Sequence, residues 1–171
     1  KKIKKIVVLD NLKDGTKKNL KSALKSKKVF LYKKDIRNYK KIYKFFKGID
    51  VVVHLAALSD IVPSIEDPAD YLETNFNGTL NILEAMRKHN VKKIIYAASS
   101  SCYGIPKKTP TSEEDIIKPM YPYAFSKYAG EQLIQHYNHV YKLNYISLRL
   151  FNVYGTRSRT NSAYGAALGV F

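Results

Sequence analysis

Short runs of apolar, mostly β-branched residues recur along the chain and predict its strands. They cover residues 6–9, 29–32, 50–55, 93–98 and 145–150. The third run reads Asp50-Val-Val-Val-His-Leu55, and a continuous apolar centre of this kind is typical of parallel strands that are covered on both faces. The pattern therefore predicts five buried strands.

Helix-forming segments separate these runs. The pattern predicts a helix over residues 17–27, a short helix over 39–46, and two long helices over 70–89 and 123–141. Strands and helices that alternate at this spacing form βαβ units with right-handed crossovers. We therefore expect an α/β fold with a doubly wound, Rossmann-type parallel sheet.

The glycine-rich turn of a dinucleotide-binding sheet is not in the chain. In such sheets the turn after the first strand binds the pyrophosphate, and an acidic residue about 20 positions later binds the ribose. Asp10 fits the acidic position, but no clustered-glycine motif precedes it or occurs elsewhere. We therefore expect the first strand and its turn to lie upstream of Lys1, and both ends of the chain to be cuts.

An incomplete sheet has consequences for domain organisation. We interpret residues 1–150 as a partial NAD-binding domain and residues 151–171 as the start of a substrate-binding region. The expected upstream strand would be central in the sheet order. Without it the two halves of the sheet would expose unpaired backbone, so we expect residues 1–171 alone to be unstable or rearranged.

The formal net charge of +16 raises nucleic acid as a partner, because basic surfaces release counterions from phosphate backbones. The excess is almost all lysine, scattered through Lys1 to Lys47 and along helix faces, which favours a solvated surface and no nucleic-acid partner. No apolar run reaches the roughly 18 to 20 residues of a membrane span. The single Cys102 cannot form an internal disulfide. We expect a cytoplasmic protein that binds neither a membrane nor a metal.

The segment Tyr123-Ala-Phe-Ser-Lys127 places a tyrosine and a lysine on one face near the start of a helix. An isolated pair of this kind also occurs on helix surfaces. Here, however, a strand that ends at Ser99 delivers hydroxyl groups two dozen residues earlier. A phenol with a reference pKa near 10 is a poor base at neutral pH, and a neighbouring ammonium together with a cationic nicotinamide would lower its pKa.

Seven stretches carry a family resemblance in order along the chain: residues 8–12, 35–38, 54–57, 75–79, 99–104, 123–127 and 148–155. With them the chain resembles the extended short-chain dehydrogenases/reductases. Within that group it is similar to the nucleotide-sugar epimerases of the NAD-dependent epimerase/dehydratase family, such as UDP-glucose 4-epimerase. The resemblance covers essentially the whole chain.

The resemblance implies NAD as the cofactor and assigns roles by position. The catalytic residues would be Ser99, Tyr123 and Lys127, with Ser99 chosen over Ser100 and Ser101 by counting back from the Tyr103-Gly104 pair. The substrate would contact Ser99, Tyr123 and Asn152, although a turn-capping role for Asn152 stays open. The cofactor would contact Asp10, Asn11, Leu12, Asp35, Ile36, Leu55, Ala56, Ala57, Asn75, Tyr123, Lys127 and Phe151. An acid at position 10 suits NAD rather than NADP, because it would repel a 2′-phosphate.

The resemblance also narrows the reaction. Relatives that dehydrate or decarboxylate their sugar usually carry acidic residues directly after the catalytic serine or threonine, whereas Ser100 and Ser101 follow here. Hydroxyl groups favour 4-epimerisation of a nucleotide-diphosphate sugar, and we expect a UDP-sugar. A 4,6-dehydratase, a UDP-glucuronate decarboxylase and a catalytically silent NAD-binding scaffold remain alternatives. A homodimer through the two long helices is a further expectation from the resemblance.

Overall fold

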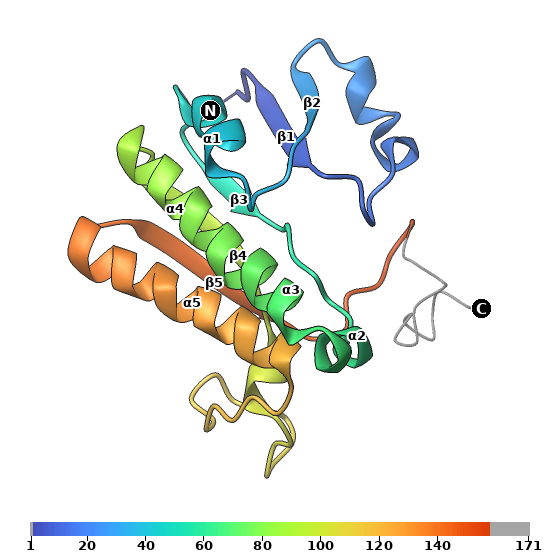
Figure 1. The fold of residues 1–171 in the computed structure, drawn as a ribbon, viewed down its shortest axis with the longest axis vertical. Helices are drawn as coiled ribbons and strands as arrows, with labels where there is room; N and C mark the ends of the chain where they lie inside the picture. Colours follow the sequence, from blue (N-terminus) through green and yellow to red (C-terminus); the bar gives the residue numbers. More distant parts are fainter. Residues whose placement is uncertain (1, 158–171) are drawn as a thin grey trace.

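The computed structural model describes residues 2–157, and Figure 1 shows their arrangement. The strands are β1 (Ile6–Asp10), β2 (Val29–Lys33), β3 (Val52–His54), β4 (Lys93–Ser99) and β5 (Asn144–Leu150). The α-helices are α1 (Tyr39–Ile42), α2 (Ile61–Glu66), α3 (Pro68–Leu72), α4 (Gly78–Lys88) and α5 (Pro122–Tyr141). Short 3₁₀ segments are η1 (Lys17–Leu20), η2 (Ala23–Lys25), η3 (Tyr43–Phe46) and η5 (Ser100–Tyr103), and η4 (Glu73–Asn77) is a π-helical turn.

All strand pairs in the described residues are parallel. β1 pairs with β2, while β4 lies between β3 and β5. Within residues 2–157 these are separate sheets of two and three strands, because β1 does not pair with β3. The parallel α/β architecture predicted from the sequence is confirmed. The break lies where the expected upstream strand would be inserted.

Helices α4 and α5 run side by side over one face of the three-stranded sheet (Figure 1). The core between these layers includes Leu83 and Met86 from α4, Ile94 from β4 and Ile134 from α5, each at most 2% exposed. Burial of such side chains is the main stabilising term of the fold. This core holds the helices against the strands, and it thereby fixes the positions of the strand ends relative to the helix ends.

Three predicted helices differ from the observed ones. Residues 17–27 form only the two 3₁₀ segments, which bury no residue, because too few apolar side chains anchor a longer helix to the sheet. The helix predicted over 39–46 divides into α1 and η3. The helix predicted over 70–89 begins earlier, at Pro68, and is interrupted by the π-helical turn η4.

Helix α2 was not predicted. It follows Asp60 and contains Pro63 in its first turn, where proline is tolerated because that N–H has no intrahelical acceptor. None of the helices in residues 2–157 is long and apolar enough to cross a membrane.

The second face of the three-stranded sheet carries apolar side chains without a cover among the described residues. Val53 on β3 is 57% exposed, and Ile146 and Leu148 on β5 are 56% and 43% exposed. Parallel sheets are normally covered on both faces. An open face of this kind leaves a large share of the usual burial energy unrealised.

We therefore predict that a purified polypeptide of residues 1–171 unfolds without a sharp thermal transition and binds a dye specific for exposed apolar surface. Circular dichroism at 222 nm measures the transition, and 8-anilinonaphthalene-1-sulfonate fluorescence measures the exposed surface. A sharp, cooperative melt with no dye binding would contradict the prediction.

Candidate functional site

The parallel strands bring several predicted site residues to one edge of the molecule. Asp10 ends β1, Ser99 ends β4, and Phe151 directly follows β5. Carboxyl ends of parallel strands lie at the same edge, which is where such sheets bind ligands. The N-terminal turn of α5 begins close to this edge in Figure 1.

The first turns of α5 carry the two residues of the tyrosine-lysine pair. Pro122 occupies the first helical turn and fixes the start of the helix. Tyr123 is partly buried, and the Ser99 hydroxyl lies near enough to act on the pKa of its phenol. Lys127 lies one turn further along α5 and is only 4% exposed. The structure therefore places Tyr123 near Ser99, with Lys127 on the following turn of α5.

Burial has the largest effect on the ionisation of Tyr123 and of Lys127. Burial raises the pKa of Tyr123 above its ordinary value of 10, and the hydrogen bond from Ser99 only partly offsets this effect. Burial lowers the pKa of Lys127 to about 7, against the attraction of Glu131. Lys127 alone therefore does not convert Tyr123 to its phenolate form at neutral pH. A further positive charge at the site is needed.

Ser99 has a second hydroxyl partner. Its Oγ accepts a hydrogen bond from the Ser101 backbone N–H at 3.2 Å and lies 2.8 Å from Ser101 Oγ. The segment η5 creates this contact by turning back directly after β4. The contact between Ser99 and Ser101 was not predicted from the sequence, because the tight turn after β4 was not recognised.

The residues predicted to hold an adenosine group form a connected turn. Asp10 Oδ1 accepts a hydrogen bond from the Leu12 N–H at 2.7 Å, and Leu12 has a left-handed φ of 59°. Asn11 donates to Asp35 at 3.3 Å, which joins the turn after β1 to the turn after β2. A hydrogen bond from Arg37 lowers the pKa of Asp35 to about 2, so its carboxylate is ionised at neutral pH.

Ile36 packs into the core, and its role beside an adenine ring stays a prediction. Its side chain is 7% exposed. A Cβ at Gly78 would lie 2.5 Å from Ile36 Cδ1, so this side chain packs tightly against the start of α4. The side chain of Ile36 therefore belongs to the core.

Asn75 holds the turn after β3. Its side-chain oxygen accepts from the Leu58 N–H at 2.8 Å, and its Nδ2 donates to the Leu58 carbonyl at 3.0 Å and to Ser126 Oγ at 2.9 Å. Ser126 in turn donates to the Tyr123 carbonyl. Asn75 therefore supports the loop that carries the predicted cofactor residues Leu55, Ala56 and Ala57, and ties it to α5.

The remaining predicted residues lie on open surface. Leu55 and Phe151 are 69% and 63% exposed, and Asn152 is exposed after β5. The structure therefore leaves them accessible without joining them to Tyr123 by a direct contact. The part of the predicted substrate-binding region beyond residue 157 lies outside the described residues.

His54 is a core residue rather than a metal ligand. Its Nε2 lies 2.9 Å from Thr79 Oγ1, and burial lowers its pKa to about 3, so the ring is neutral. Within residues 2–157 no group of three or more metal-ligating side chains lies together.

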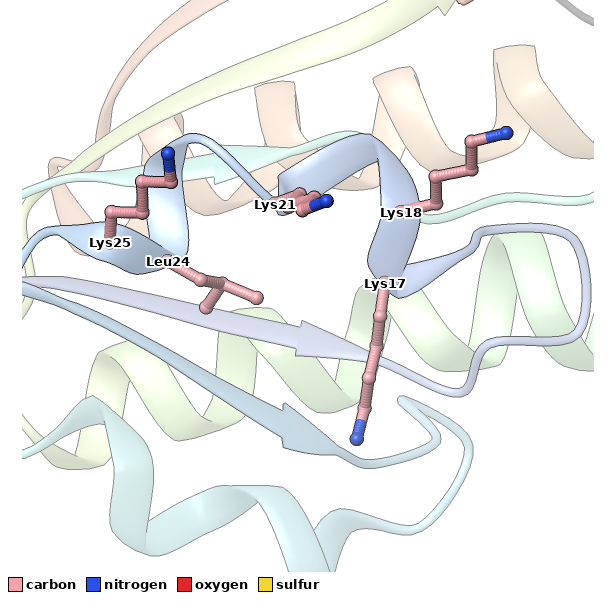
Figure 2. A pocket seen from close by; sticks show the side chains of 5 residues that line it. All are labelled: Lys17, Lys18, Lys21, Leu24 and Lys25. Carbon is pink, nitrogen blue, oxygen red and sulfur yellow. The ribbon is translucent and has the colours of Figure 1, made fainter.

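A pocket on the lysine-rich surface lies outside the predicted site. Figure 2 shows it over η1 and η2, with a volume of about 510 Å³. It is lined by Lys17, Lys18, Lys21, Leu24 and Lys25. The four lysines are exposed, and none of the residues that line the pocket is a predicted site residue. This agrees with a solvated basic surface.

Comparison with known proteins identifies close relatives. The model described as "NAD dependent epimerase/dehydratase family" matches residues 1–168. A curated UDP-glucose 4-epimerase from Lacticaseibacillus casei is 37% identical over 152 residues, which are 88% of this chain and 44% of that protein.

Solved structures give the same result. A UDP-N-acetylglucosamine 4-epimerase from Methanobrevibacter ruminantium M1, in complex with UDP-N-acetylmuramic acid, is 33% identical with a TM-score of 0.90. The match covers 96% of this chain and 52% of that one. A dTDP-glucose 4,6-dehydratase from Streptomyces venezuelae with NAD bound is 27% identical with a TM-score of 0.87, covering 91% and 48%. The chain thus spans about half the length of these relatives.

We predict that Asn75→Ala destabilises the full-length protein by about 2–3 kcal/mol, because the buried Leu58 backbone groups and the Ser126 hydroxyl lose their partner. Urea unfolding measures the change. Asn77→Ala is the matched control, since Asn77 only donates to Glu73 on the exposed surface. Equal effects of the two substitutions would contradict the role of Asn75.

We also predict that Tyr123 titrates above pH 10 in the ligand-free, full-length protein, because burial disfavours the phenolate. The tyrosinate absorbance near 295 nm of the wild type minus that of Tyr123→Phe isolates this group. A midpoint below 10 without ligand would show that the lysine suffices to ionise the phenol.

Proposed function

Because the chain belongs to the NAD dependent epimerase/dehydratase family, we propose that the full-length protein is a nucleotide-sugar 4-epimerase. The observation that carries this proposal is the position of Tyr123 at the start of α5, near Ser99 at the end of β4, with the buried Lys127 on the next turn of α5. The reaction would proceed by transient oxidation of the sugar at C4 to a 4-keto intermediate. Residues 1–150 would contribute the cofactor-binding part and residues from 151 onward the start of the substrate region.

The residues at the carboxyl edge fit NAD. The Lys127 ammonium, on the turn of α5 that follows Tyr123, would bind the hydroxyls of a nicotinamide ribose. Asp10 and Asn11 would bind the adenosine ribose from the turn that also contains Leu12. The remaining contacts would come from Asp35, the backbone of Ile36, Leu55, Ala56, Ala57, the loop held by Asn75, and Phe151.

When bound, NAD would supply the acceptor for a hydride and a positive charge near the phenol. The chain's own residues would do the proton chemistry. Tyr123 would take the proton of the sugar 4-hydroxyl through its Oη, which requires the phenolate form. Ser99 would donate a hydrogen bond to the reacting oxygen, and Lys127 would favour the phenolate by its charge. After the keto sugar turns within the pocket, Tyr123 would return the proton to the other epimer.

Epimerisation is favoured over elimination by the side chains that follow Ser99. Ser100 and Ser101 supply hydroxyl groups but no carboxylate. Loss of water from the sugar needs an acid and a base beyond the tyrosine. The alternatives are a 4,6-dehydratase, which a solved relative represents, and a UDP-glucuronate decarboxylase.

The substrate and assembly are parts of the same proposal. We propose a UDP-sugar, which would contact Ser99, Tyr123 and Asn152. The complete protein would form a homodimer through α4 and α5. A nucleic-acid partner is not part of the proposal, and a catalytically silent NAD-binding scaffold is the alternative from another functional class.

We predict that Tyr123→Phe in the full-length protein lowers turnover of the preferred UDP-sugar on the order of 10²–10⁴-fold, with NAD still bound, because the phenylalanine cannot accept the proton. UDP-glucose, UDP-N-acetylglucosamine and UDP-glucuronate are the substrates to test. Proton NMR of the sugar anomeric signals distinguishes a 4-epimer from a dehydrated or decarboxylated product.

Tyr121→Phe is the matched control, since Tyr121 is exposed at the start of α5 and should leave turnover unchanged. Unchanged turnover in Tyr123→Phe would refute the assignment of the base. NAD binding without conversion of any of the three sugars would favour the scaffold.

A further inference from the structure

The buried lysine lies against an aromatic ring. Lys127 Nζ is 4.3 Å from the centroid of the Tyr96 ring, and Tyr96 lies on β4 with 0% of its surface exposed. A cation within about 6 Å of a ring face is attracted by the negative potential of that face, and the attraction is strongest where water is excluded. The ring therefore forms the contact surface for the lysine charge.

Two further contacts prevent the Tyr96 ring from moving away. Its hydroxyl donates to the Lys127 carbonyl at 3.1 Å, so both ends of the same lysine meet this tyrosine. A Cβ at Gly130 would lie 2.7 Å from Tyr96 Oη and 3.3 Å from the Asn75 carbonyl. Only a glycine at this place lets α5 approach β4 closely enough for the ring to reach the ammonium.

Glu131 also favours the charged form of Lys127, but its carboxylate is shared with Arg149. On α5, burial raises the pKa of Tyr123, so its phenol carries no charge at neutral pH. Glu131 forms a 3.0 Å ion pair with Arg149 of β5. Arg149 also binds the Tyr103 hydroxyl at 2.9 Å, so the charge of Glu131 is shared with that network. On β3, His54 is neutral. The Tyr96 ring is the group that directly contacts the ammonium.

We propose that Tyr96 is a positioning residue for Lys127, whose ring face holds the ammonium in its charged form beneath the start of α5. The inference rests on the proposed function, because a charged Lys127 is what would favour the Tyr123 phenolate. It assigns a task to a strand residue whose side chain is fully buried. Loss of the ring interaction would favour the neutral amine of Lys127 over its ammonium form, and Tyr123 would then be a weaker base.

The test measures the ionisation of Lys127 itself in the ligand-free, full-length protein. Lysine is labelled with ¹³C at Cε, and the signal is followed against pH by NMR. Because the pKa of Lys127 is lowered to about 7, its signal should titrate far from those of the surface lysines, and Lys127→Met assigns it by removing it. Tyr96→Phe keeps the ring and should leave the midpoint within a few tenths of a pH unit.

Progressively fluorinated phenylalanines at position 96 then weaken the negative ring face with little change in ring shape. We expect the midpoint of Lys127 to fall with each added fluorine, by about one pH unit over the series. Tyr137→Phe, on the same helix but hydrogen-bonded to Glu84, is the control and should not move the midpoint. A midpoint independent of fluorination would overturn the proposal.

Turnover separates this inference from the proposed function. With an active wild type, the kcat of the fluorinated series should fall at pH 7 while KM stays nearly constant. An inactive wild type whose Lys127 midpoint still follows fluorination would refute the proposed function and leave the positioning of the lysine established. An active series with no change in midpoint or pH profile would refute the positioning alone.

Discussion

The close approach of α5 to β4 is the constraint on which the rest of the structure depends. Gly130 permits it, since any side chain at this position would collide with the Tyr96 hydroxyl. The approach buries Lys127 and Glu131 along one side of the helix and places Tyr123 at the level of Ser99. Burial of two charged side chains is costly unless they gain partners, and here the ring of Tyr96 and the guanidinium of Arg149 supply them.

The π-helical turn η4 serves the same arrangement from the neighbouring helix. It lies between α3 and α4, and it directs the Asn75 side chain at both Leu58 and Ser126. The Thr79 hydroxyl donates to the Asn75 carbonyl at 2.6 Å and also contacts His54. The Asn75 carbonyl in the π-helical turn therefore has a hydrogen-bond partner within the protein. Such π-turns often occur at functional sites because they change the direction of a side chain without ending the helix.

The sequence was sufficient for the strands and for the relation of Tyr123 to Lys127, because both follow from local spacing. The five strands occur where the apolar runs predicted them, and the parallel arrangement follows from their alternation with helices. The failures were non-local. Residues 17–27 have a helical pattern, but they lack an apolar surface to pack against and form only two 3₁₀ segments. The packing of Ile36 against Gly78 is equally non-local and could not be predicted from spacing. Tyr96 resembled an ordinary strand residue, since its contact with Lys127 joins positions 31 apart in the chain.

Lys127 is buried and its pKa is about 7. Near neutrality a large fraction of its amine carries a free electron pair, whereas an ordinary lysine with a pKa near 10.4 is almost wholly protonated. The amine of Lys127 is therefore partly in its nucleophilic, unprotonated form at neutral pH. Its burial confines that reactivity to small electrophiles, so the packing that tunes the amine also shields it from indiscriminate modification.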